Sequence, residues 1–232
     1  DRGYALSARG LTREIASAFD LTFTDPAADP QVAAVDTSQV HAAQESLIDV
    51  TVDDSTRARR FGLAKVEGIN PAAKAPFWMQ RELMLSGIRS VNAATDVTNY
   101  VMLLLGQPMH AFDADKISGN LHVRNASAGE EFETLDHTKR TLLDSDVVIT
   151  DDAGIQSLAG VMGGVTSEIS DETVNVYFEA ASWDELTVAK TARHHKLSSE
   201  ASRRFERGVD PAIVEVALDV ACALLTSIAL SL

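Results

Sequence analysis

The sequence has a single cysteine, Cys222, among its 232 residues. One cysteine excludes a disulfide within the chain, and its place in an apolar helical pattern predicts a reduced thiol in the core. No run reads as long and apolar enough to cross a membrane. The chain opens without a secretory signal, and the start at Asp1 indicates a cut from something longer. These absences favour a cytoplasmic setting.

Basic residues are scarce, since 20 Lys and Arg stand against 34 Asp and Glu and give a net charge of −14. This balance argues against a broad nucleic-acid surface, which needs a basic stripe to neutralise phosphates. It does not exclude contact with one end of a nucleic acid held elsewhere. Five basic residues crowd one short segment, which is either a solvated face or a local anion site: Arg193, Lys196, Arg203, Arg204 and Arg207.

Several catalytic signatures are missing from the sequence. No cysteine pair and no closely spaced His, Asp and Glu set has metal-ligand spacing, so no metal site is predicted. There is no Walker loop or Gly-x-Ser-x-Gly, and the glycines of GVMGG do not fit the dinucleotide fingerprint. The remaining candidates are scattered polar groups that suit binding, or hydrolysis by a positioned water: Thr98, Asn99, His110, Gly163, Glu179 and Ser199.

The first third of the chain predicts a helix, a loop and two strands. Apolar spacing predicts a helix over 6–20, whereas 24–46 is rich in Asp, Ala and Pro and predicts a long loop or linker. Alternating apolar residues predict a half-buried strand at 48–52, and residues 61–69 predict another.

Two helices are expected next. Pro76 opens the first at its first position, and Gly87 closes it. Asp96 is the expected N-cap of the second, which covers 97–105 and ends at Gly106. A Gly-Gln-Pro break follows. His110 lies just past it, and by itself it reads as a buried histidine that donates to a nearby carbonyl.

Residues 121–169 alternate strand-like pieces with turn residues and lack helix signals, so a small all-β unit is expected there. Three glycines punctuate its last strand: Gly160, Gly163 and Gly164. They predict either a bulge with a hairpin turn or a close approach of the backbone to a ligand.

After this unit, alternation predicts a strand through Phe178 that puts Glu179 on the face opposite Phe178. Ser182 and Glu185 match a capping box, so a helix is expected from Trp183 to about His195. Asp210 and Pro211 then open a last, apolar-striped helix. The expected fold class is α+β, with mixed sheets, flanking helices and an inserted small all-β subdomain. The expected organisation is a helix and flank at 1–23, a loop or linker at 24–46, and one module at 47–232 with the β-rich insertion at 121–169.

Three long runs carry a family resemblance: GIRSVNAATDVTNYVMLLLGQPMHAFD, LAGVMGGVTSEISDETVNVYFEAASW and SSEASRRFERGVDP. In this order they resemble the editing module, the paired B3/B4 domains, of the beta subunit of bacterial phenylalanyl-tRNA synthetases. The resemblance covers nearly the whole chain and is weakest at about 24–59. It implies hydrolysis of tyrosine wrongly esterified to phenylalanine tRNA, at a second site that binds the tRNA 3′ end between the two subdomains.

The resemblance also implies partners. The parent enzymes are heterotetramers of two alpha and two beta subunits, in the cytoplasm, with ATP and magnesium serving the alpha-subunit site. This chain shows no class II synthetase motif, so no aminoacylation and no ATP site are expected in it.

Residue by residue, the resemblance implies an amino-acid pocket. Glu179 matches the position of the family's tyrosine-reading glutamate. A carboxylate suits that role because it accepts a strong hydrogen bond from a phenol. Bound phenylalanine would leave that carboxylate unpaired, at a cost on the order of a few kcal/mol. Gly163 matches a glycine that leaves room for the aromatic ring, and Ala201 matches a position where a larger residue would block entry.

At the ester end, His110 matches the family's editing-site histidine. Positioning of water is favoured over proton abstraction, because no carboxylate partner of His110 is evident from sequence. Thr98 and Asn99 match residues near the substrate's amino group or the terminal ribose. Ser199 stands where many relatives carry threonine. Lys196, where relatives often have glycine, is expected outside the pocket.

Structural alternatives stay open for several of these residues. Glu179 could pair with an arginine and Asn99 could cap a turn, although the resemblance favours function for Glu179, His110 and Gly163. For the arginines, internal ion pairs are favoured over tRNA contact. The alternative function is a noncatalytic tRNA-positioning or subunit-packing module of the synthetase.

Overall fold

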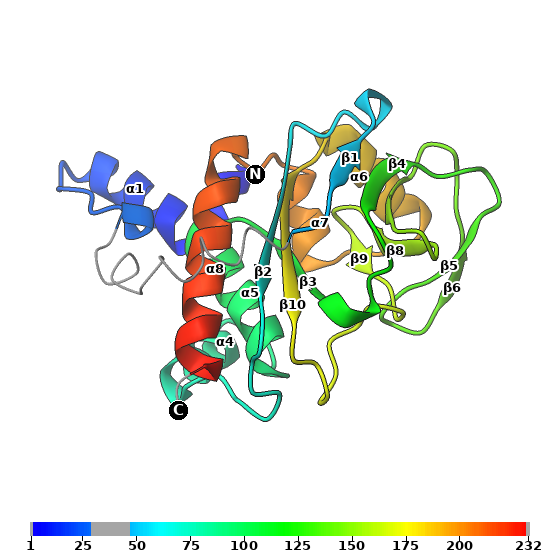
Figure 1. Ribbon diagram of the computed structural model, residues 1–232. Helices are drawn as coiled ribbons and strands as arrows, with labels where there is room; N and C mark the ends of the chain where they lie inside the picture. Colours follow the sequence, from blue (N-terminus) through cyan, green and yellow to red (C-terminus); the bar gives the residue numbers. More distant parts are fainter. Residues whose placement is uncertain (1, 29–46, 231–232) are drawn as a thin grey trace.

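The computed structural model describes residues 2–28 and 47–230, and most of the predicted linker at 24–46 lies outside these ranges. The architecture is α+β, as expected (Figure 1). A three-stranded antiparallel sheet has the order β2-β10-β3. Its strands are Arg60–Val66 (β2), Val176–Ser182 (β10) and Met109–Asp113 (β3).

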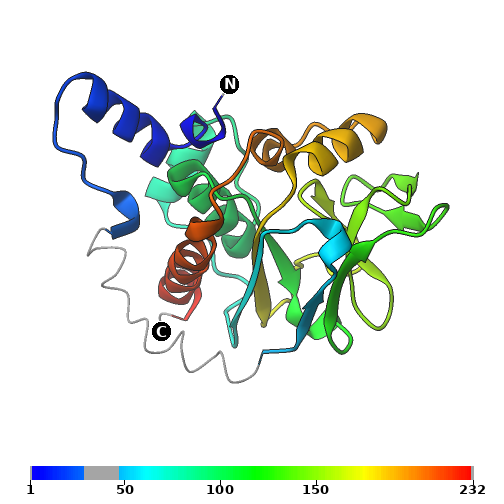
Figure 2. The same cartoon turned by 90° about the horizontal axis from the view of Figure 1, so that it is seen from above.

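Helices cover one side of this sheet, and a second sheet lies on the other side (Figure 1). The helix α8 (Val214–Ala229) packs across β2 and β10, and α5 (Ala93–Leu105) packs between α8 and β3. Figure 2 shows the N-terminal helix α1 (Ala8–Ala18) on the side of the molecule away from the second sheet. The remaining helices are α4 (Phe77–Leu85), α6 (Glu185–His194) and α7 (Glu200–Phe205).

The second sheet takes four of its five strands from the stretch 121–169, which was predicted to be β-rich, and one strand from earlier in the chain. Its order is β1-β4-β7-β8-β9, and β1 pairs parallel with β4. The strands are Val50–Val52 (β1), Leu121–Asn125 (β4), Val147–Thr150 (β7), Ile155–Leu158 (β8) and Met162–Gly163 (β9), and a separate hairpin is formed by Glu131–Glu133 (β5) and Lys139–Thr141 (β6). The pairing of β1 with this sheet was not evident from the sequence.

The predicted start of α5 was wrong. The N-cap is Asn92, whose side chain accepts a hydrogen bond from Thr95 N, and not Asp96. Asp96 instead lies within the first turn, where its buried carboxylate accepts from Ser90 Oγ at 2.5 Å and Val91 N at 2.9 Å. Asn92 is as good a capping residue as Asp96, so the helix begins a turn earlier. Its end at Gly106, with φ of 84°, agrees with the prediction.

Two further helix starts differ from the expectation. The helix α6 begins at Glu185 with Asp184 as its N-cap, because Ser182 still belongs to β10 and its hydroxyl donates to Val209 O. Pro76 is the N-cap of α4 and not its first residue. The short helix α7, which Ser199 caps, was not predicted.

The segment Pro211–Ala229 begins as predicted, with the Asp210 side chain capping and Pro211 at the first position. By length and composition it is apolar enough to cross a membrane, so the expectation that no run qualifies was wrong. Its apolar window is 56% buried inside this fold. A buried core helix meets the same test, and Cys222, fully buried with a free thiol, lies on it as expected.

One buried carboxylate, next to strand β7 of the second sheet, contacts residues of α6 and its C-terminal end. Asp146 is 1% exposed, and its Oδ2 lies 2.7 Å from Nε2 of His195 and accepts from Leu143 N at 2.9 Å. Its Oδ1 accepts from Thr191 Oγ1 at 2.8 Å. The carboxylate therefore has three partners from two parts of the chain, which offsets the cost of burying its charge.

Replacing Asp146 with asparagine is expected to lower the free energy of unfolding by about 2 kcal/mol, because an amide cannot accept all three hydrogen bonds. Urea unfolding of the chain measures this. The control is Asp144→Asn, an exposed aspartate two residues earlier whose change should stay within about 0.5 kcal/mol. Equal losses in the two variants would contradict the role given to Asp146.

Candidate functional site

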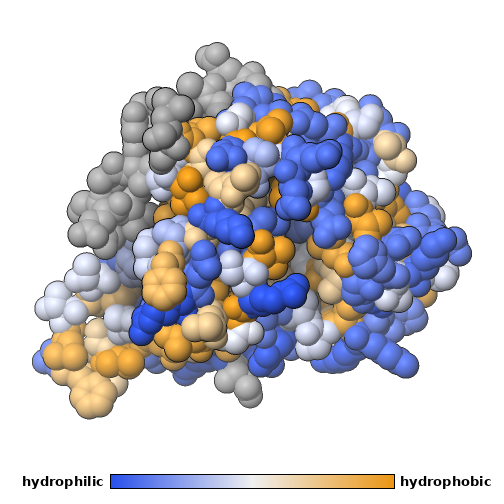
Figure 3. Space-filling model, turned by 90° about the horizontal axis from the view of Figure 1, so that it is seen from below, coloured by the Kyte–Doolittle hydropathy of each residue, from blue (hydrophilic) through white to orange (hydrophobic). Residues whose placement is uncertain are grey.

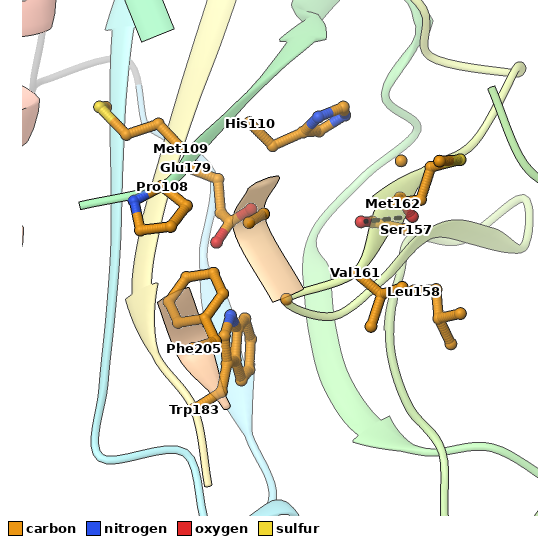
Figure 4. A pocket seen from close by; sticks show the side chains of 13 residues that line it. Pro108, Met109, His110, Ser157, Leu158, Val161, Met162, Glu179, Trp183 and Phe205 are labelled. Carbon is orange, nitrogen blue, oxygen red and sulfur yellow. Dashed lines mark hydrogen bonds between the residues drawn. The ribbon is translucent and has the colours of Figure 1, made fainter. Parts of the chain in front are cut away.

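A cavity of about 60 Å³ lies between the three-stranded sheet and the second sheet (Figure 4). This is room for a few water molecules. Its walls come from the start of β3, from β8 and β9, from β10 and from α7. The residues that line it are Pro108, Met109, His110, Ser157, Leu158, Gly160, Val161, Met162, Gly163, Glu179, Trp183, Ala201 and Phe205.

Strand pairing brings Glu179 and His110 together. In the antiparallel pair of β10 and β3 these two residues are directly opposite each other, so their side chains leave the same face of the sheet. The buried Gln107 fixes the start of β3, because its Nε2 donates to Ala181 O at 2.9 Å and to Pro108 O at 2.8 Å. The Gly-Gln-Pro break thus serves to turn the chain from α5 into β3.

The Glu179 carboxyl is buried without a partner. The residue is 6% exposed, and within the described part of the chain its carboxyl has no hydrogen bond and no ion pair. The alternative that it pairs with an arginine therefore finds no support in this geometry. Burial raises the pKa of Glu179 to about 8, because removal from water disfavours the charged form.

The His110 ring lies against the ring of Phe112, edge to face, with 4.5 Å between centroids. Its Nε2 is buried and has no partner among the residues described. Burial lowers the pKa of His110 to about 4. The imidazole is therefore neutral at pH 7, where it can donate or accept a hydrogen bond but is a weak base.

Gly163 on β9 faces this imidazole from the second sheet. A Cβ at Gly163 would lie 2.2 Å from Cε1 and 2.5 Å from Nε2 of His110. The sequence interpretation gave the space beside Gly163 to a bound aromatic ring. In this structure the histidine ring occupies it, so the glycine is what allows the two sheets to approach here.

Comparison with known proteins bears on this arrangement. The family model of the B3/4 domain matches residues 57–230. The chain belongs to the B3/4 domain family.

Relatives of this B3/4 domain carry a common name. The chain is 75% identical over 229 residues to a phenylalanine–tRNA ligase beta subunit of Corynebacterium glutamicum. The matched residues are 99% of this chain and 27% of that protein. A beta subunit of Corynebacterium diphtheriae is 73% identical over the same shares. The chain thus spans about a quarter of the length of these relatives. An N-terminal fragment of the phenylalanyl-tRNA synthetase beta subunit from Pyrococcus horikoshii has a TM-score of 0.43 and 18% identity, covering 63% of this chain and 49% of its own.

Four of the predicted site residues of the B3/4 domain line one cavity: His110, Gly163, Glu179 and Ala201. The other three do not line it. Ser199 caps α7, and its Oγ donates to O of the lining residue Val161 at 2.8 Å, so it contacts the wall without lining the cavity. Thr98 donates to Thr95 O within α5, and Asn99 is on the same helix. Because α5 starts at Asn92, these two lie in its second turn and not its first.

The sequence interpretation missed several lining residues of the B3/4 domain, above all Trp183 and Phe205. Trp183 was read as the first residue of a helix, whereas it follows β10 and is 3% exposed. Gly160 was the sequence signal for this wall, since a glycine in a strand often marks a close approach. In the structure its φ is 69°, and a Cβ there would lie 2.7 Å from Trp183 Cδ1.

The arginine cluster mostly forms internal contacts, in agreement with the structural interpretation. Arg203 and Arg204 both pair with Glu200, and Arg207 pairs with Glu206. The buried Arg204 also donates to Leu6 O and so holds the N-terminal segment. Lys196 is exposed outside the cavity with φ of 55°, a left-handed conformation that explains why glycine suits this position.

Metal ligands do not gather at this site. Within residues 2–28 and 47–230, no group of three His, Cys, Asp or Glu side chains could hold a metal ion.

Proposed function

We propose that this B3/4 domain is the editing unit of a phenylalanine–tRNA ligase beta subunit and hydrolyses tyrosyl-tRNA(Phe) whose 3′ end it binds. The observation that carries the proposal is the Glu179 carboxyl. It is buried without a partner among the described residues, in a cavity whose other walls include the rings of Trp183 and Phe205. A carboxyl in either protonation state keeps an acceptor oxygen for a phenol.

The cavity supports selection of tyrosine over phenylalanine. A tyrosyl phenol would donate to Glu179, whereas a phenyl ring would leave the carboxyl desolvated and unpaired, on the order of a few kcal/mol less favourable. A benzene-sized ligand needs a cavity of about 150 Å³, more than the 60 Å³ present. Side chains that line the cavity therefore have to move outward as the ring enters.

His110 fits a positioning role at the ester. Its neutral ring offers Nε2, which has no partner in the described chain, to a water or to the terminal ribose. Attack of that water on the ester carbonyl would release tyrosine and leave the hydroxyl on the tRNA. Since aminoacyl esters are labile, orientation of the water supplies much of the rate, and a pKa near 4 does not suit a general base.

The rest of the parent enzyme is part of the same proposal. The chain would work within a beta subunit that assembles with an alpha subunit, two of each, in the cytoplasm. ATP and magnesium would serve the synthetic site carried by the alpha subunit, and no step at the cavity described here requires them.

The test is deacylation of tyrosyl-tRNA(Phe) by the full heteromeric enzyme carrying Glu179→Ala or His110→Ala. Each variant is expected to lower kcat/KM at least about tenfold, the worth of one hydrogen bond to a charged or buried group. Phenylalanylation by the same preparations shows that the enzyme is folded and assembled. If both variants deacylated tyrosyl-tRNA at the unaltered rate, the editing proposal would fail.

A second candidate, a subunit-packing module, rests on exposed apolar side chains. Figure 3 shows apolar atoms gathered where α1 projects. Phe19 is 72% exposed, and Phe77 on α4 is 80% exposed. The packing function predicts that Phe77→Ser weakens assembly with the other subunit, whereas the cavity variants leave assembly unchanged. One domain can carry out both editing and subunit packing, and only the cavity variants test the editing function.

A further inference from the structure

Trp183 has a buried polar group that lacks a hydrogen-bond partner in the part of the chain that the structure describes. The residue directly follows β10 and is 3% exposed, and its ring packs edge-on against Phe61 with 6.0 Å between centroids. Its indole Nε1 has no hydrogen-bond partner among the described residues. Buried tryptophan N–H groups usually have a partner, so an orphaned one calls for an explanation.

The orphaned group belongs to the same cavity as Glu179. Both residues line it, and Figure 4 shows the indole nitrogen on the end of the Trp183 ring that points toward the Glu179 carboxyl, with the Phe205 ring alongside. Gly160 allows this placement, because a Cβ there would lie 2.7 Å from Trp183 Cδ1. Two groups that lack a partner among the described residues, the Glu179 carboxyl and the Trp183 N–H, therefore face one space.

The two groups are complementary in hydrogen bonding. An indole N–H can only donate, and a carboxyl offers an acceptor oxygen. A phenol hydroxyl does both at one oxygen, since it donates its proton and accepts on its lone pairs. It is therefore a ligand group that satisfies both at once, whereas a phenyl ring satisfies neither.

We propose that Trp183 is a second specificity-determining residue, whose indole N–H donates to the phenol oxygen while that hydroxyl donates to Glu179. The inference rests on the proposed editing function and deepens it. It divides the selection of tyrosine between two residues, so a phenylalanyl ester leaves two buried groups unpaired.

The experiment compares deacylation of tyrosyl-tRNA(Phe) and phenylalanyl-tRNA(Phe) by the full heteromeric enzyme with Trp183→Phe. Loss of one hydrogen bond is expected to lower kcat/KM for the tyrosyl ester about tenfold. The phenylalanyl ester should change by no more than about twofold, because it never used the N–H. The matched control is Trp78→Phe at the other tryptophan, which is 48% exposed on α4 and packs on Tyr100.

A substrate change separates hydrogen bonding from packing. The amino group of 4-aminophenylalanine donates but accepts poorly, so its tRNA ester should lose much less than the tyrosyl ester when Trp183 becomes phenylalanine. Equal losses for all three esters would show that Trp183 only fills space and would overturn the inference. The same holds if the tyrosyl ester is unaffected.

Failure of the inference is distinguishable from failure of the proposed function. If Glu179→Ala abolishes the preference for the tyrosyl ester and Trp183→Phe preserves it, only the role of Trp183 is overturned. If the unaltered enzyme shows no preference, the proposed function falls and the inference with it. Should Trp183→Phe misfold, a structure of the unaltered enzyme with tyrosine decides: a phenol oxygen within about 3.2 Å of Nε1 supports the inference, and a longer distance overturns it.

Discussion

Replacing Gly163 with alanine is expected to lower the deacylation of tyrosyl-tRNA(Phe) by the full enzyme about a hundredfold. The new Cβ would lie 2.2 Å from His110 Cε1, closer than any real contact, so the imidazole has to rotate or the sheets have to separate. Either change moves the group that we propose to position the water. Single-turnover deacylation, with phenylalanylation as the check on assembly, measures the effect.

The adjacent glycine provides the matched control for this substitution. A Cβ at Gly164 would meet the Phe132 ring at 2.6 Å, and Gly164 does not line the cavity. Gly164→Ala should therefore destabilise the second sheet while deacylation by the folded enzyme persists. If the two alanine variants slowed deacylation by the same factor, general destabilisation would explain both and the specific role of Gly163 would be lost.

Replacing Glu179 with glutamine is expected to stabilise the protein at alkaline pH and not at acidic pH. The pKa of Glu179 is raised by burial from 4.5 to about 8. A raised pKa in the folded state favours the protonated form of Glu179. The contribution of this protonated carboxyl to folding stability is fully present below pH 4.5 and is lost as pH rises through about 8. Glutamine does not titrate. The difference in the free energy of unfolding between Glu179→Gln and the unaltered protein therefore grows by about 1.4 kcal/mol per pH unit across this window, to about 5 kcal/mol above it.

Urea unfolding at pH 5, 7 and 9 tests this dependence. The control is Glu131→Gln, an exposed glutamate on β5 outside the cavity, which should follow the unaltered protein at every pH. Curves for Glu179→Gln that run parallel to the unaltered protein between pH 5 and 9 would contradict the burial of an unpartnered acid at this site.

The local elements were readable from the sequence where one signal dominated. Alternation identified the strand that carries Glu179, and Gly106 marked the end of α5. Where two residues competed for one role, the sequence did not decide between them. Asn92 and Asp96 both cap helices well, and Ser182 matched a capping box although strand pairing holds it in β10. Tertiary contacts made these choices, and a local pattern does not contain them.

The composition of the cavity wall was harder to predict from the sequence than the local elements, because it depends on pairing between strands far apart in the chain. The resemblance drew attention to His110 and Glu179, but only the register of β3 with β10 makes them direct neighbours. Thr98, Asn99 and Ser199 were grouped with them first as polar candidates and then on the resemblance, and none of the three lines the cavity. Their predicted contacts with substrate stay predictions. Trp183 was not predicted as a site residue, because the sequence placed it at the start of a helix. In the structure it is buried and forms part of the cavity wall.

The order of strands has a consequence for how the protein is made. The central strand β10 pairs with β2, which leaves the ribosome far earlier, and the whole β-rich stretch is synthesised between them. Until β10 emerges, β2 and β3 have no partner in their sheet, and closing so long a loop is slow. Among the features of the described chain, the cavity is thus one of the last to form. A nascent chain stalled before Val176 would have neither Glu179 nor the completed sheet that holds His110, so it would lack the cavity.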